Sequence, residues 1–159
     1  MSEDNRRVLA AWAADCAERV LPIFEDCSPQ DPRPRDAIEG ARAWVRGDIP
    51  ADAAQALALD AHDAARAVAD RAARSAARAA GQACAVAQMG AQARHAAAYA
   101  VAAVMQSDPN DTESTAAELQ WQRAQLSGPN RALAYPDEHQ HDALSTGSSP
   151  QCEAPSTQR

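Results

Sequence analysis

RAARSAARAAGQACAVAQM, residues 71–89, decides the fold class because it forms two distinct faces when wound as a helix. Arginines at positions 71, 74 and 78, followed by Gln82, occupy one face. The opposite face carries only small residues, namely Ala73, Ala76, Ala80, Ala83, Cys84 and Ala87. Alanine has the highest intrinsic helix propensity, and side chains three and four positions apart share a helix face. The stretch therefore predicts a helix that its neighbours can approach closely.

The same composition extends over the whole chain of 159 residues. Alanine supplies more than half of the 46% hydrophobic residues, whereas Phe occurs once, Tyr twice and Trp three times. Alternating β-branched residues, which are typical of strands, are nearly absent. We therefore expect an all-α fold, a single-domain bundle of five or six antiparallel helices.

Apolar residues recur at helical spacing in six segments. These segments span about 3–25, 33–46, 50–69, 71–89, 91–106 and 112–126. The first has an apolar stripe of Leu9, Trp12, Ala13, Cys16, Val20, Ile23 and Phe24, and the fifth should point Ala97, Val101, Val104 and Met105 inward. Pro22 predicts a kink or a break in the first segment. Periodicity ends at Gly128, so we expect a helical domain over 1–128 and a disordered, low-complexity tail over 129–159.

The segment DPRPRDAIEGARAWVRG, residues 31–47, concentrates four arginines and two prolines. On a helix that starts near Pro34, an inward stripe forms from Ile38, Ala41, Trp44 and Val45. Glu39 lies between Arg35 and Arg42 on the outer face, where ion pairs at this spacing stabilise a helix. No aromatic residues interleave with these arginines to stack on bases. The segment predicts an ion-paired surface helix rather than a nucleic-acid contact.

The charge of the chain limits its partners. The formal net charge is −7 and the pI is about 5.0, so the basic surface needed to bind nucleic acid is not expected. No uncharged run of about 18 apolar residues occurs, so we expect no membrane span. The N-terminal MSEDNRR has no apolar signal core, and the four cysteines form no CxxC pair. We therefore expect a cytoplasmic protein with reduced thiols.

The histidines form no recognisable metal-binding pattern. His139 and His141 lie near Cys152 in the low-complexity tail, but a structural zinc site needs four convergent ligands in an ordered frame. HExxH is absent from the sequence, and so is the pair of ExxH motifs that a di-iron bundle uses. We expect no metal and no cofactor.

The alanine-rich centre contains the candidate site. His62 precedes Arg66 by one helical turn, and His95 precedes Tyr99 by one turn. Alanine layers flanked by polar side chains can leave a small ligand pocket, which we expect to be lined by His62, Cys84, Gln88, Gln92, His95 and Tyr99. A Cys–His or His–Tyr reaction centre is conceivable. No nucleophile elbow or glycine loop frames these residues, so we assign no catalytic residue and leave enzymatic activity open.

Four blocks of the sequence carry a family resemblance. They are LAAWAADCAERVLPIFE, DPRPRDAIEGARAWVRGDI, ARAAGQACAVAQMGAQARHAAAYA and WQRAQL, within residues 9–126. Together they resemble a bacterial family of small helical immunity proteins, the immunity-protein-five-like group. The resemblance implies an all-helical single domain that neutralises a toxin by binding it. The family's central block commonly carries histidines where this chain has Gln88 and Gln92, so no catalytic residue is carried over.

Three function hypotheses follow. The leading one is a non-enzymatic binding protein, an immunity protein that neutralises its cognate bacterial toxin by direct contact. The alternative is a small-molecule-binding protein for resistance or sequestration, or a tailoring protein of a biosynthetic cluster, that uses the pocket in the alanine-rich helices. The third is a structural subunit that homodimerises through an alanine-rich face.

Overall fold

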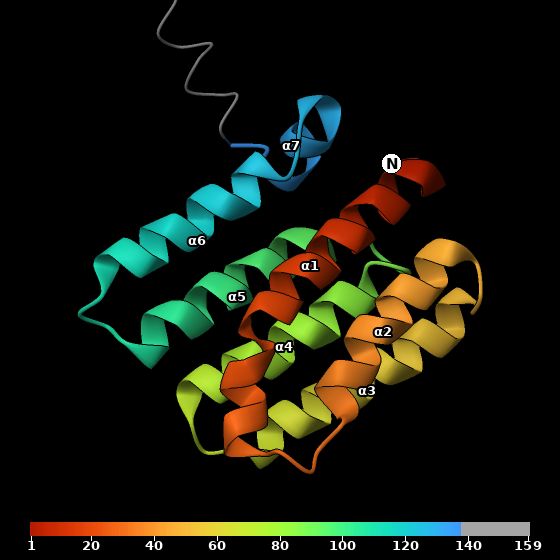
Figure 1. Ribbon diagram of the computed structural model, residues 1–159. Coiled ribbons are helices and arrows are strands. Elements are labelled where there is room, and N and C mark those ends of the chain that lie inside the picture. The colour runs from red at the N-terminus through yellow and green to blue at the C-terminus, as the bar shows by residue number, and fades with distance from the viewer. Residues whose placement is uncertain (138–159) are drawn as a thin grey trace, which may run out of the picture.

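The computed structural model describes residues 1–137, and these residues form seven helices and no strand (Figure 1). The helices are α1 (Glu3–Cys27), α2 (Arg33–Arg46), α3 (Ala51–Ala67), α4 (Arg71–Ala85), α5 (Gln92–Ser107), α6 (Thr112–Ala124) and α7 (Gly128–Ala134). The predicted all-α fold is confirmed. Helix α7 was not expected, because the sequence loses its periodicity at Gly128. Residues 138–159, most of the expected tail, lie outside the described residues.

The helix ends follow local backbone chemistry. Helix α2 has the predicted bounds and stops at Gly47, whose φ of 82° is a left-handed conformation that glycine adopts without a Cβ clash. Helix α1 continues through Pro22 without the break that was one of the two effects predicted for this proline. Helix α4 ends four residues before the predicted Met89, and two turns then connect it to α5. Gly90 lies in this connection, consistent with the poor helix propensity of glycine.

Helix α4 occupies the centre of the bundle and packs against α1, α2, α3 and α5 (Figure 1). The residues predicted to face inward are all buried, namely Ala73, Ala76, Ala80, Ala83, Cys84 and Ala87. Because alanine adds little bulk, the neighbouring helices can approach α4 closely. The large buried side chains come mainly from α1 and α2, namely Leu9, Trp12, Val20, Leu21, Phe24, Ile38 and Trp44. The core therefore has an alanine centre flanked by larger residues.

Helix α5 turns a different face inward from the one predicted. Its buried residues are Ala93, Ala96, Ala97, Ala100 and Ala103. Of the predicted inward set only Ala97 is buried, whereas Val101 and Val104 are half-buried and Met105 is 47% exposed. The physical reason is that α5 packs against α4 and α1, where small side chains permit closer contact than valine or methionine.

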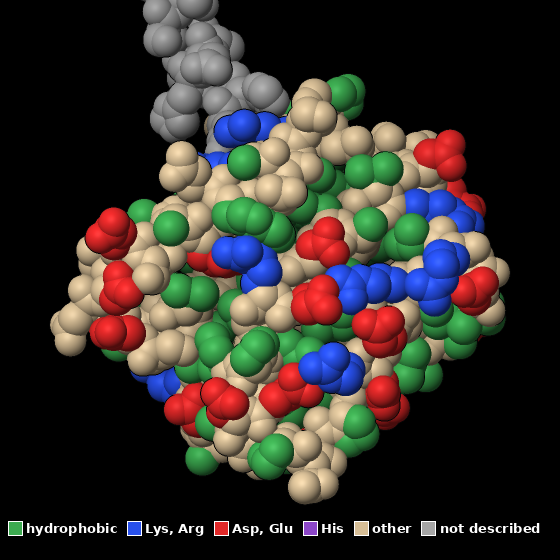
Figure 2. All heavy atoms as spheres, in the orientation of Figure 1, with side chains coloured by type: hydrophobic (Ala, Val, Ile, Leu, Met, Phe, Trp, Pro, Cys, Tyr) green, Lys and Arg blue, Asp and Glu red, His purple; other side chains and the backbone are tan. Residues whose placement is uncertain are grey.

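Ion pairs cover the outer face of α1 and α2, where Figure 2 shows acidic and basic side chains intermixed. Arg42 of α2 bridges Glu39 at 3.2 Å, Asp15 of α1 at 3.0 Å, and Glu18 of α1. Arg35 bridges Glu25 at 2.6 Å. The predicted ion-paired surface is present, and its bridges tie α2 to α1 rather than running only along α2.

Helix α6 lies beside α5 and is attached differently from the other helices (Figure 1). Its two buried residues are the polar Glu118 and Gln122. The Nε2 atom of Gln122 donates to the carbonyl oxygen of Ala97 at 3.0 Å. The indole Nε1 of Trp12 donates to the backbone oxygen of Gln122 at 2.9 Å. Hydrogen bonds of Gln122 thus connect α6 to both α5 and α1.

Candidate functional site

His62 of α3 stacks over α4 at a glycine. A Cβ atom added to Gly81 would lie 2.7 Å from Cε1 of His62, so a side chain at position 81 would displace the imidazole. Burial lowers the pKa of His62, and the neighbouring Arg66 and Arg78 lower it further. The imidazole is therefore neutral at pH 7 and lies in a positive field.

Cys84 of α4 is sealed inside the core. It is fully buried, and its Sγ atom donates to the backbone oxygen of Ala54 at 3.0 Å. Burial raises the pKa of the Cys84 thiol to about 12. Because the thiolate is the reactive form, this thiol is inert at neutral pH. Burial also raises the pKa of Cys16 in α1, so both are structural side chains.

Gln88 and Gln92 lie together on the surface, between the end of α4 and the start of α5. With Gln55, Ala85 and Met89 they line a hollow of about 380 Å³. The Nε2 atom of Gln88 donates to Oδ1 of Asp52 at 3.0 Å. These glutamines are the two members of the predicted pocket that share one hollow. Its polar lining offers amide groups to a ligand.

His95 and Tyr99 of α5 lie one turn apart, as their spacing predicts. His95 is exposed, whereas Tyr99 is half-buried and packs against the core. The guanidinium of Arg78 lies 5.9 Å from the centre of the Tyr99 ring. Arg78 therefore stands near both Tyr99 and His62, whereas Cys84 is sealed off from solvent.

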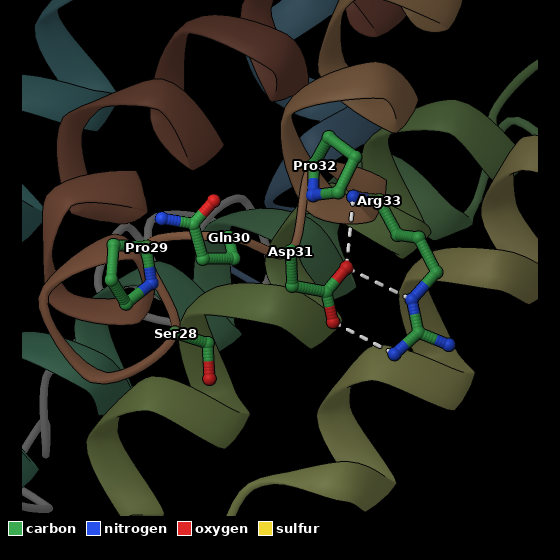
Figure 3. Close-up of a pocket in the computed structure, with 6 residues that line it drawn as sticks. All are labelled: Ser28, Pro29, Gln30, Asp31, Pro32 and Arg33. Atoms are coloured by element: carbon green, nitrogen blue, oxygen red, sulfur yellow. Dashed lines mark hydrogen bonds and ion pairs between the residues drawn. The ribbon is translucent and has the colours of Figure 1, made fainter.

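The hollow in Figure 3 belongs to the loop between α1 and α2 and was not anticipated. It has a volume of about 480 Å³ and is lined by Ser28, Pro29, Gln30, Asp31, Pro32 and Arg33. Asp31 accepts hydrogen bonds from Nε of Arg33 at 2.9 Å and from Nη2 at 2.7 Å, and Arg33 holds the pKa of the Asp31 carboxyl below its usual range. The charges of Asp31 and Arg33 neutralise each other, so the main effect of this ion pair is to fix the start of α2.

A second unanticipated hollow lies between α5, α6 and α7. It measures about 260 Å³ and is lined by Arg94, Ala97, Ala98, Val101, Leu119, Gln122 and Tyr135. Most of these residues are apolar. The α7 helix, which sequence periodicity did not reveal, brings Tyr135 to this place.

The arginines of α4 form the most distinctive charge feature. Arg71 is exposed, and Arg74 and Arg78 are half-buried on the same side of the helix. Between Arg71 and Ser107 the sequence contains four Arg and one His but no Asp or Glu. This run without acids was visible in the sequence, and its contrast with the net charge of −7 is the signal that could have identified it.

Residues 1–137 offer neither a metal centre nor a membrane-spanning helix. No group of three or more His, Cys, Asp and Glu side chains there could hold a metal ion. No helix in that part of the chain combines the length and apolar character needed to cross a membrane. His139, His141 and Cys152 lie outside the described residues.

Comparison with known families identifies the family of the chain. The family model described as "Imm-5 like putative immunity protein" matches residues 1–129, which contain α1 to α6 and the first residues of α7. No curated protein and no solved structure gives a significant match. Because the match covers most of the chain, the chain belongs to the Imm-5 like putative immunity protein family.

Proposed function

We propose that this protein is a cytoplasmic immunity protein that neutralises a bacterial toxin by binding it directly, without catalysis. The observation that carries the proposal is the family match over residues 1–129, which covers six complete helices rather than a fragment of the bundle. The inert environment of Cys84 is consistent with a binding role, since its thiol is both buried and protonated at neutral pH.

The net charge of −7 supports association with a basic toxin. Complementary long-range charge raises the association rate more than the final affinity, and salt screens the effect. A basic partner should therefore associate more slowly as ionic strength rises, while its dissociation rate changes little.

The experiment pairs this chain with the candidate toxin encoded beside its gene. The toxin is induced in bacteria with and without the full-length chain, and survival is counted while the level of the chain is followed by immunoblot. Purified toxin and chain are then mixed and passed over a size-exclusion column. Survival together with a joint peak supports the proposal. A well-expressed chain that neither protects the cells nor co-elutes would contradict it.

A small-molecule role remains the second candidate because Gln88 and Gln92 share one hollow. Its volume of about 380 Å³ lies within the range typical of ligand sites. The test compares Gln88→Ala/Gln92→Ala with the wild type, both for toxin protection and for thermal shifts with compounds from the same gene cluster. Protection that survives in the variant assigns the toxin role elsewhere on the surface. A compound that stabilises only the wild type would support the alternative, and sedimentation of the free chain would reveal any homodimer.

A further inference from the structure

Most arginines of residues 1–107 fall into two groups. In residues 1–70, seven of the eight arginines form ion pairs with carboxylates: Arg7, Arg19, Arg33, Arg35, Arg42, Arg46 and Arg66. The four arginines of α4 and α5 form no ion pair with a carboxylate of any described residue. An acidic protein thus keeps one region in which positive charge is not neutralised.

Three of these arginines form a continuous row, which we call the arginine stripe: Arg71, Arg74 and Arg78. Their spacings of three and four place them on one side of α4, and the row extends over about 10 Å of helix. On one flank, Nη2 of Arg74 donates to the backbone oxygen of Val68 at 3.2 Å, just beyond α3. On the other flank, Arg78 lies over Tyr99 of α5.

One end of the stripe opens into a surface hollow. Arg71 lines a depression of about 320 Å³ together with Met105, Gln106 and Pro109. Met105 is 47% exposed, so the depression combines an arginine with an apolar side chain. The Oγ of Ser75 donates to Oε1 of Gln106 at 2.7 Å and links α4 to α5 beside it. A partner can therefore gain both ionic and apolar contact here.

The stripe also contains an unsatisfied donor. The Nε atom of Arg74 is buried and donates no hydrogen bond to any described residue. A buried guanidinium N–H without an acceptor is unfavourable, because it has lost water without gaining a replacement. An anion bound at the stripe could supply that acceptor after a small movement of the side chain.

His62 reports the same local field. Its pKa is lowered by burial and by Arg66 and Arg78, and only Asp63 acts in the opposite direction. The imidazole lies against Gly81, which follows Arg78 on the same side of α4. Arg66 belongs to α3 and Arg78 to the stripe, so the stripe supplies part of the positive field at His62.

We propose that the arginine stripe is a docking surface for an acidic segment of a partner protein, one that presents carboxylates at helical spacing. Arginine pairs with carboxylates through two parallel hydrogen bonds, which gives such a contact geometric specificity. The proposal goes beyond the toxin-binding function, because it is argued from the charges of α4. It applies to a carboxylate-bearing partner whether or not that partner is the toxin.

Two features favour a short acidic protein segment over a nucleic acid. The exposed Asp60, Asp63 and Asp70 border the region in sequence, and the whole chain carries a net charge of −7, so a long polyanion is repelled beyond the stripe. Tyr99 is half-buried beneath Arg78, so the stripe offers no open aromatic platform for bases.

The test uses the full chain and a fluorescein-labelled, alanine-based helical peptide of about 15 residues, long enough to form a helix. Glutamates at positions i, i+3 and i+7 match the stripe, and a second peptide carries Gln at those positions. Fluorescence anisotropy at low and physiological salt measures binding to the wild type, to Arg74→Gln/Arg78→Gln, and to the matched control Arg94→Gln. We expect the acidic peptide to lose about tenfold in affinity for the double variant and to bind the control like the wild type.

A second readout does not depend on the double variant being folded. The imidazole resonance that His62→Gln removes is titrated by NMR in the wild type, with and without the acidic peptide. Carboxylates beside Arg78 should offset the positive field, so the pKa of His62 should rise when the peptide binds. The Gln peptide should leave that pKa unchanged.

Several outcomes would overturn the proposal. These are equal affinity of the two peptides, equal losses in the double variant and in Arg94→Gln, and an unchanged pKa of His62 at saturating acidic peptide. Tighter binding of a DNA duplex than of the peptide would assign the stripe to nucleic acid. Self-association of the wild type that the double variant abolishes would assign it to a second copy of the chain. Toxin protection is measured separately, so it can fail while the stripe still binds the peptide.

Discussion

The guanidinium of Arg19 on α1 binds the carboxylate of Glu118 on α6, with 2.9 Å between Nε and Oε2. The same guanidinium lies 3.9 Å from the centre of the Trp121 ring. The side chain of Glu118 is only 6% exposed, whereas that of Arg19 is 41% exposed. Because the carboxylate is the buried partner, it depends on Arg19 more than Arg19 depends on it.

Replacement of Arg19 should therefore loosen α6. We expect Arg19→Ala to lower the free energy of unfolding by about 1.5–3 kcal/mol, the range typical of hydrogen bonds to charged groups. Urea denaturation monitored by tryptophan fluorescence measures the loss. Arg35→Ala, which breaks the more exposed pair with Glu25, should cost less than about 1 kcal/mol. Equal losses in the two variants would show that Glu118 does not depend on its partner.

The contact between Gly81 and His62 predicts a reversal of sign. Gly81→Ala should destabilise the protein, because the new Cβ would displace the His62 ring. In a His62→Ala background the same change should stabilise it by about 1 kcal/mol, the gain in helix propensity from glycine to alanine. A double-mutant cycle built from four melting curves measures the coupling. If the stability changes of the two single variants simply added in the double variant, the His62 ring would be free to move away from a side chain at position 81.

The alanine faces of α4 should resist enlargement. Ala76, Ala80 and Ala83 are fully buried, so a change of any one to Leu should overpack the core and cost about 1–3 kcal/mol. The matched control is Ala117→Leu on the exposed side of α6, which should change stability little. If all three α4 variants melted at the wild-type temperature, the alanine face of α4 would not be tightly packed in the core.

The buried thiols predict a loss of stability in alkali. The pKa of Cys84 is raised from its ordinary value of 9.0 to about 12, so the stabilising contribution is complete below pH 9 and declines as pH rises toward the folded value. The decline should be about 1.4 kcal/mol per pH unit for one such thiol. The free energy of unfolding, measured by urea denaturation at several pH values across this range, should therefore fall less steeply with pH for Cys84→Ala than for the wild type. An equal fall in the two proteins would contradict the raised pKa of the Cys84 thiol.

The same burial makes the cysteines distinguishable by labelling. In a Cys152→Ser background, a thiol reagent at neutral pH should modify the exposed Cys27 quickly and leave the buried Cys16 and Cys84 intact. Mass spectrometry after brief exposure counts the modified sites. Rapid labelling of Cys84 under native conditions would mean that α4 separates from its neighbours.

The inner face of a helix was predictable where charged and small residues lie on opposite sides of it. In α4, arginine and alanine alternate with a helical period, so both faces were predicted correctly. In α5, alanine occupies positions on several sides, and periodicity therefore does not identify the inner face. Val101 and Met105 were predicted to face inward, with Ala97 and Val104, from their helical spacing. Packing against α4 instead favoured the small residues.

The candidate site was predictable only within single segments. His95 and Tyr99 lie one turn apart as expected, and Gln88 and Gln92 share a hollow. Spacing within one helix does not determine which residue of the next helix it meets. The contact of His62 with Gly81 depends on how α3 is aligned along α4, and no local pattern determines that alignment. Helix α7 was missed for another reason, because its seven residues are too few to show a helical period.

The alanine centre of α4 also has a consequence for divergence within the family. An alanine side chain has no rotamers to fix, and its neighbours leave no room for a larger one. The inner positions of α4 should therefore exchange only among Ala, Gly, Ser and Cys as sequences drift. Recognition of different partners can then change only through residues on the outer surface of the bundle, the arginine stripe of α4 included, while the buried residues of α4 stay almost constant in size.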